Sequence, residues 1–244
     1  MTVLHGFPSQ PGPDSEDDFG LAPAFGVDQQ VDRQLETVWR RSAVDNHLDR
    51  LVASIDLLRA QSARLVRWGE HLAEVLAAGG RLLAAGNGGS AAEAQHLSAE
   101  LVGRLRDDRP AYSAIALHAE SSSLTAIGND YGYERVFARQ VEAHGRAGDV
   151  LVLLSTSGRS PNLLGAADAA REREMTAWAL TGYLPNPLAM RCDDVLALPT
   201  DPQTVQELQL VAVHLLCAQV EAALPAAHAR VGRPHRAQAN LERR

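Results

Sequence analysis

Short apolar runs alternate with amphipathic segments from residue 81 to residue 198, and this alternation limits the possible folds more than any other feature. The runs are apolar throughout rather than at every second position, which indicates strands covered on both faces of a sheet. Because right-handed crossovers through helices return each strand alongside the last, the strands should be parallel. We therefore predict an α/β fold, a doubly wound five-stranded parallel sheet with strands at residues 81–85, 114–117, 149–154, 175–181 and 194–198.

Helical patterns flank the expected sheet on both sides. Apolar residues recur at helical spacing between residues 31 and 78, which predicts two helices that end before Gly79 and Gly80. A last helix is expected at residues 204–224. The predicted organisation is one domain at residues 31–225, in which the sheet carries a helical N-terminal extension.

The two ends of the chain have the composition of tails. Residues 1–30 combine prolines with an acidic run, so they have little to bury and are expected to be disordered. Residues 226–244 form a basic tail rich in arginine. Such a tail could contact an acidic partner or nucleic acid, although a solvated terminus is the commoner explanation.

Composition excludes several classes of function. With 23 basic against 30 acidic residues the formal charge is -7, so nucleic acid is an unfavourable partner. All basic side chains are arginines, and a chain without lysine can use neither Schiff-base chemistry nor a lysine-bearing phosphate loop. The two cysteines, Cys192 and Cys217, suit a reducing compartment. No signal peptide and no apolar run approaching about 18 residues is recognisable, so we expect a cytoplasmic protein without a membrane partner.

Two loops after expected strands could hold an anion. The first, GNGGS at residues 86–90, has glycines that let backbone N–H groups approach a ligand, and Ser90 is expected to cap the following helix. The second, STSGRS at residues 155–160, places hydroxyls at a helix N-terminus, where unpaired N–H groups attract anions. A tight turn explains the first loop equally well, and a capped helix is an alternative for the second. Together the two loops favour a phosphomonoester site at the carboxyl edge of the sheet.

Candidate chemical groups lie on two helices. His96 and Glu100 are four residues apart, so they share a helix face and could reach one metal ion or one substrate. An exposed polar pair is a common alternative for this spacing. On the last helix, Gln206 and His214 lie on one side but about 12 Å apart along the axis. His214 stands among apolar residues, where a hydrogen-bonded core histidine is the ordinary interpretation.

These motifs together resemble the SIS (sugar isomerase) domain and, more narrowly, the phosphoheptose isomerase family. The resemblance covers about residues 45–224 and rests on GNGGS at 86–90 with His96 and Glu100, TAIGNDYG at 125–132, RAGDVL at 146–151, STSG at 155–158, and VQE at 205–207 with His214. It implies a flavodoxin-like SIS fold and a homotetramer with its site at a subunit interface. It also implies an aldose–ketose isomerase of heptose biosynthesis, which interconverts sedoheptulose 7-phosphate and a D-glycero-heptose 7-phosphate through an enediol.

The resemblance further implies a role for each matching residue. One Zn²⁺ per subunit would be held by His96, Glu100, Gln206 and His214. Glu100 and His214 would be the catalytic acid–base pair. The small-molecule sugar phosphate would contact Asn87, Gly88, Gly89, Glu100, Asn129, Asp130, Ser155, Thr156, Ser157, Ser160 and Gln206.

Three positions depart from the family pattern. Arg159 stands where the family usually has asparagine, so a cation flanks the expected phosphate pocket. Residues 181–187 read TGYLPNP where the family usually has a glycine-rich turn. Gln203 and Thr204 stand where the family often has a charged residue.

Two other functions remain open at the level of sequence. Some SIS relatives are tetrameric binding proteins that regulate replication by holding the initiator protein. The basic tail favours this alternative, whereas Glu100 and His214 favour the enzyme. A sugar-phosphate sensor is a third alternative, but a sensor needs no paired acid and base.

Overall fold

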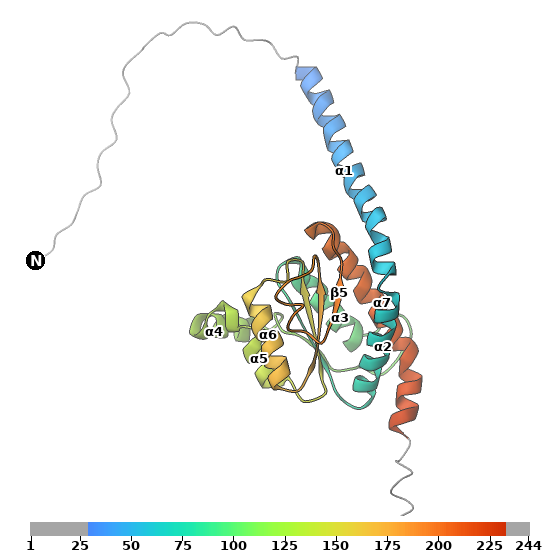
Figure 1. Ribbon diagram of the computed structural model, residues 1–244, viewed down its shortest axis with the longest axis vertical. Coiled ribbons are helices and arrows are strands. Elements are labelled where there is room, and N and C mark those ends of the chain that lie inside the picture. Colours follow the sequence, from blue (N-terminus) through green and yellow to red (C-terminus); the bar gives the residue numbers. More distant parts are fainter. Residues whose placement is uncertain (1–28, 233–244) are drawn as a thin grey trace, which may run out of the picture. The chain divides into compact units, whose positions relative to one another are not determined.

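The computed structural model describes residues 29–232 of the chain (Figure 1). Residues 1–28 of the segment predicted to be disordered, and residues 233–244 of the basic tail, lie outside the described residues. The chain divides into two compact units, of which the first ends at Asn46 and the second begins at His47. Helix α1 (Gln29–Arg59) crosses this boundary, and in the first unit its side chains Val38 and Val44 are exposed. The domain predicted at residues 31–225 stays a prediction.

The second unit is built on the predicted five-stranded sheet. Its strands are β1 (Leu82–Gly86), β2 (Ala114–Ala116), β3 (Val150–Ser155), β4 (Thr176–Thr181) and β5 (Asp194–Ala197). All neighbouring strands are parallel and the order is β2-β1-β3-β4-β5, which confirms the doubly wound prediction. The β1 and β3 strands are buried along their whole length, which is why their sequences are apolar throughout. Because the strand order reverses between β1 and β3, a crevice is expected at their carboxyl ends.

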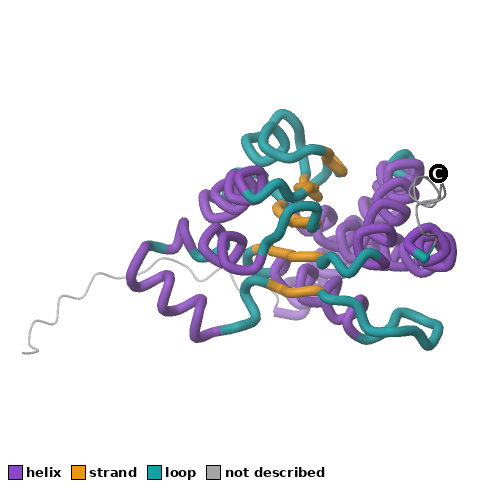
Figure 2. Tube along the Cα trace, turned by 90° about the horizontal axis from the view of Figure 1, so that it is seen from below, coloured by secondary structure: helices purple, strands orange, loops and turns teal. Residues whose placement is uncertain are grey.

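Helices cover both faces of the sheet (Figures 1 and 2). One face packs against α2 (Ser62–Ala77), α3 (Gly89–Val102) and α7 (Pro202–Val231), and the other against α5 (Ala138–His144) and α6 (Pro161–Glu172). Successive side chains of each strand serve opposite faces, so Leu82 joins the first core and Leu83 the second. Each fully buried leucine contributes about 1.5–3 kcal/mol relative to an exposed one. The two cores fix α3 and α7 on the same face of the sheet.

Helix α7 is longer than the sequence predicts. It begins after Asp201, whose carboxylate accepts a hydrogen bond from the Thr204 N–H, and it continues through Pro225 to Val231. The predicted end of this helix at residue 224 is therefore wrong, because Leu224 and Ala227 continue to pack into the core, whereas the tail predicted at residues 226–244 stays a prediction. By length and composition alone α7 is apolar enough to cross a membrane, which the sequence analysis did not anticipate. Its buried face accounts for part of this apolarity, and Leu210, Val211 and Leu215 are apolar side chains on its exposed face.

Candidate active site

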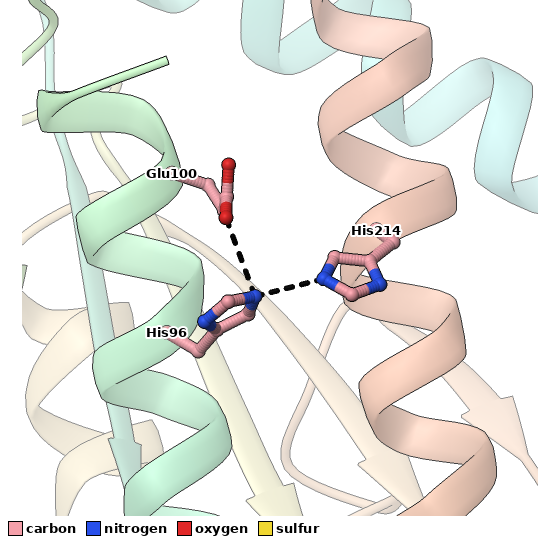
Figure 3. Close-up of side chains that lie close together, drawn as sticks. All are labelled: His96, Glu100 and His214. Carbon is pink, nitrogen blue, oxygen red and sulfur yellow. Dashed lines mark hydrogen bonds and ion pairs between the residues drawn. The ribbon is translucent and has the colours of Figure 1, made fainter. Parts of the chain in front are cut away.

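Three titratable side chains converge between α3 and α7 (Figure 3). His96 and Glu100 lie one turn apart on α3, and His214 faces them from α7. His96 Nε2 lies 2.8 Å from His214 Nε2 and 3.3 Å from Glu100 Oε1. One donor atom from each residue lies within 4.8 Å of the others. The structure thus brings together His96 and Glu100, which the sequence pairs, and His214, which lies 118 residues further along the chain.

This cluster could hold a metal ion. Two imidazole nitrogens and a carboxylate oxygen form a donor set that divalent transition metals favour. Donor atoms about 2.0–2.1 Å from a tetrahedral ion lie roughly 3.3 Å from one another, close to the 3.3 Å between His96 and Glu100. Glu100 Oε2 is buried and has no hydrogen-bond partner among the described residues, and a cation would satisfy it. The residues present therefore fit a metal ion.

Gln206, the fourth predicted ligand, lies near the start of α7. Its side chain packs so closely on Gly89 that a Cβ at that position would lie 2.7 Å from Gln206 Oε1. A side chain at position 89 would therefore displace the end of the Gln206 side chain. Gln206 also lines the cavity described next, and its membership of the metal site stays a prediction.

A small polar cavity lies where β1 and β3 end. Its volume is about 130 Å³. Its walls are Asn87, Ser90, Leu154, Ser155, Thr156, Ser157, Ser160, Leu163 and Gln206. The polar groups of this wall are amides and hydroxyls, so the cavity offers uncharged donors beside the N-terminus of α6. This arrangement can accept an anion without a lysine.

The first loop differs in detail from the prediction. Gly88 has a φ of +56° and precedes α3, which begins at Gly89, so Ser90 is not the helix cap. Ser90 is buried and its hydroxyl donates to Gln209 Oε1 at 3.3 Å. Gln209 in turn donates to the Leu180 carbonyl at 2.8 Å. The serine therefore ties α3 to α7 rather than starting α3.

The second loop folds around its own hydroxyls. The Gly158 N–H donates to Ser155 Oγ at 3.0 Å, and the Arg159 N–H donates to Ser157 Oγ at 3.3 Å. Ser160 precedes α6, and its side chain makes no capping hydrogen bond. The Arg159 side chain, which departs from the family pattern, is exposed.

A buried asparagine, Asn162, orients Asn87 and was not among the residues predicted from the sequence. Asn87 and Asn162 exchange two side-chain hydrogen bonds of 3.0 and 2.9 Å, and the Tyr133 hydroxyl donates to Asn87 Oδ1 at 3.3 Å. Asn162 is only 2% exposed. Its position directly after Pro161, in the first turn of a helix that follows the serine-rich loop, was the available signal.

A buried arginine fixes the end of α3 that carries Glu100. The Arg109 side chain is 9% exposed, and it donates to the Glu100 carbonyl at 2.6 Å and to the Leu101 carbonyl at 3.0 Å. These carbonyls belong to the last turn of α3, which has no helical partners for them. Arg109 also donates to Glu221 Oε1 at 3.1 Å, and Glu221 lies two turns beyond His214 on α7. The pair therefore links the backbone of Glu100 to the helix of His214.

Glu93 is a carboxyl group near the cluster that was not predicted from the sequence. It lies on α3 three residues before His96 and seven before Glu100, a spacing that places all three on one helix face. Its residue surface is 8% exposed, and Oε2 has no hydrogen-bond partner among the described residues. Burial raises the pKa of Glu93 to about 8. The spacing was visible in the sequence, but the burial was not.

Asn129 and Asp130 lie apart from the cavity wall. Both are exposed near the end of α4 (Ser121–Tyr131), and Asn129 Nδ2 donates to Asp130 Oδ1 at 2.7 Å. Neither residue is among those that line the cavity. Their contact with substrate stays a prediction, as does that of Gly88 and Gly89.

Known proteins match this chain in both sequence and structure. The SIS domain profile matches residues 47–182. A phosphoheptose isomerase from Streptomyces coelicolor is 62% identical over 182 residues, 74% of this chain and 79% of that protein. One from a Bradyrhizobium species is 48% identical over 187 residues, 74% of this chain and 93% of that protein. The solved phosphoheptose isomerase from Neisseria gonorrhoeae is 38% identical, covers 75% of this chain and 98% of its own, and has a TM-score of 0.70. The chain therefore belongs to the SIS domain family and, within it, to the phosphoheptose isomerases, which are sugar phosphate isomerases.

Proposed function

We propose that this protein converts sedoheptulose 7-phosphate to D-glycero-heptose 7-phosphate in the cytoplasm. The observation that carries the proposal is the approach of Glu100 to His214, on separate helices, in a chain that also has a cavity lined by uncharged hydrogen-bonding groups. The names of the relatives from Streptomyces coelicolor and Neisseria gonorrhoeae support the substrate class.

The two catalytic groups would divide the proton transfers. Moving the carbonyl from C2 to C1 requires a proton to leave C1 and to arrive at C2, with an enediol between the two steps. Glu100 would take the proton from C1 and return it to C2. His214 would protonate O2 as the enediol forms and then accept the proton from O1.

Zinc is the metal that we propose for the His96, Glu100 and His214 cluster, with Gln206 as a fourth ligand. Bound zinc would polarise the substrate carbonyl as a Lewis acid. The two carboxylate oxygens of Glu100 differ in environment, because Oε1 faces His96 while Oε2 is buried and has no hydrogen-bond partner within residues 29–232. Metal analysis and turnover before and after chelation test this proposal, and turnover that survives complete metal removal would contradict it.

The cavity would hold the far end of the substrate. The hydroxyls of the loop at residues 155–160 and the N-terminus of α6 would donate to the phosphate oxygens, and the paired Asn87 would hold a sugar hydroxyl. Binding energy from the phosphate would then align C1 and C2 with Glu100 and His214.

Product analysis of the Glu100→Gln variant by NMR tests the mechanism. We expect the wild type to convert sedoheptulose 7-phosphate and the variant to lose at least about 100-fold in turnover, the usual contribution of a general base. Glu172→Gln, an exposed position at the end of α6, is the matched control. Undiminished turnover in Glu100→Gln would reject Glu100 as the base. A zinc-loaded wild type without turnover would favour the binding-protein alternative.

We propose a homotetramer as the assembly. An apolar groove of about 310 Å³ lies between α1, α2 and α7, with Ile55, Val66, Val211 and Leu215 among its lining residues. Val211 and Leu215 are exposed on either side of His214, and exposed apolar surface of this kind typically marks an interface. Light scattering on the full chain measures the mass directly, and a monomer would contradict the proposal.

A further inference from the structure

The loop after β4 packs directly on the loop at residues 155–160. The Gly182 N–H donates to the Thr156 carbonyl at 3.2 Å, and the Leu188 N–H donates to the Gly158 carbonyl at 3.0 Å. This is the segment in which the chain departs from the glycine-rich turn usual in the family. The departure therefore lies in contact with the proposed phosphate loop.

The side chain of Asn186 in this loop also contacts Gly158. A Cβ on Gly158 would lie 2.1 Å from Asn186 Oδ1, so the amide occupies the space that a side chain at position 158 would fill. Gly158 has a φ of +61°, a conformation that favours glycine. The turn at Gly158 is therefore held from one side by its own backbone and from the other by Asn186.

The amide of Asn186 is itself fixed by several hydrogen bonds. Asn186 is 3% exposed; its Nδ2 donates to Thr181 Oγ1 at 3.1 Å and to the Tyr183 carbonyl at 3.0 Å. Its Oδ1 accepts from the Ala189 N–H at 2.9 Å. Thr181 is fully buried and pairs with Ser155 in the sheet. A fully satisfied buried amide of this kind has little freedom to move.

The contact between Asn186 and Gly158 also affects the wall of the cavity. The Gly158 N–H donates to Ser155 Oγ, so the position of Gly158 sets the orientation of a hydroxyl in the cavity wall. We infer that Asn186 is a positioning residue that holds the Ser155–Gly158 turn in the shape that binds the phosphate of the substrate. This inference rests on the proposed function, because it assigns the phosphate to this cavity.

The test compares Asn186→Gly with the wild type, using inorganic phosphate as the probe. We expect the Kd for phosphate to rise by about tenfold, the size of one hydrogen bond to a charged group. The KM for sedoheptulose 7-phosphate should rise by the same factor while kcat stays within about twofold, because the lost contact acts equally on ground and transition states. Tyr183→Ala is the matched control, since this residue of the same loop is 65% exposed and the substitution retains its carbonyl.

A double-mutant cycle with Gly158→Ala distinguishes loss of the Asn186–Gly158 contact from a general loss of folding. In the wild-type background the added methyl meets the Asn186 amide, whereas Asn186→Gly removes that obstacle. The phosphate Kd should therefore rise less for Gly158→Ala in the Asn186→Gly background than alone. Unchanged phosphate binding in Asn186→Gly, additive effects in the cycle, or a wild type that binds no phosphate would overturn the inference. If the Kd for phosphate changes as expected in the variants but the wild type shows no turnover, the inference about Asn186 stands and only the isomerase proposal is rejected.

Discussion

The two ends of the candidate site are built in opposite ways. The reacting end, His96, Glu100 and His214, consists of titratable side chains on two helix surfaces, and His214 is exposed. The anchoring end, the cavity at the carboxyl ends of β1 and β3, consists of neutral amides and hydroxyls. Groups that exchange protons or bind a metal must be reachable, whereas neutral donors hold an anion well only when they are fixed in advance.

Each end also depends on a different buried polar residue. At the reacting end Arg109 joins the last turn of α3 to Glu221 on α7 through a charged pair. At the anchoring end Asn186 holds Gly158 through a neutral amide. Because a different residue supports each end, we expect that a substitution can impair metal binding and leave phosphate binding intact, or the reverse.

The largest effect is expected from Arg109→Ala. The substitution leaves Glu221, whose side chain is 12% exposed, without its cation, which costs up to about 3–5 kcal/mol of unfolding free energy. Loss of the tie between α3 and α7 should also weaken metal binding by about tenfold or more while phosphate binding is retained. Urea denaturation and titrations with zinc and with phosphate measure these effects.

The control for this prediction is Arg64→Ala. Arg64 pairs with Asp194, and both side chains are more exposed than those of Arg109 and Glu221. We expect a loss of about 0–1 kcal/mol and no change in metal binding. Equal losses in the two variants, or parallel losses of zinc and phosphate binding, would show that the two ends form one unit.

A smaller effect is expected from Glu93→Gln, which tests how a buried carboxyl group beside the reacting end changes the free energy of unfolding. The folded protein holds the Glu93 proton up to a pKa of about 8, whereas the unfolded chain releases it near the ordinary value of 4.5. Between these values the folded state binds more protons, so the stability due to Glu93 is present at low pH and is lost as the pH rises. The slope is at most about 1.4 kcal/mol per pH unit.

Urea denaturation from pH 5 to pH 8 measures this dependence. The wild type should lose stability with rising pH, and the Gln variant should lose less, because an amide does not titrate. Parallel curves for the two proteins would show that Glu93 is ionised in the folded state at neutral pH.

The fold followed from the sequence because its determinants are local. Runs such as residues 150–154 are apolar throughout, which favours a sheet covered on both faces, and the alternation with helices predicted the parallel order. The errors occurred where tertiary packing overrides a local signal. Pro225 lies inside α7 because the helix continues to pack beyond it, and Ser90 bonds to Gln209 because Gly88 already begins the turn into α3.

The site was less predictable because its parts are distant in sequence. The spacing of His96 and Glu100 placed both on one face, but the approach of His214 depends on how α3 packs against α7. The roles of Asn162, Arg109 and Asn186 depend on partners that no spacing rule identifies. The resemblance to the family predicted the role of His214, whereas the roles of the other three residues could be recognised only from the packing in the structure.

The smallest effect is expected from Arg159→Asn, which restores the residue usual in the family. Arg159 is exposed beside the anchoring end, so its attraction for the substrate phosphate is screened over about 10 Å at 0.1 M salt. We expect the KM for sedoheptulose 7-phosphate to rise by about twofold at low salt and the difference to vanish near 1 M salt, where screening shortens to about 3 Å. Arg171→Gln, at the far end of α6, is the control. A larger effect that persists at high salt would mean that Arg159 contacts the phosphate, and the anchoring end would then not be neutral.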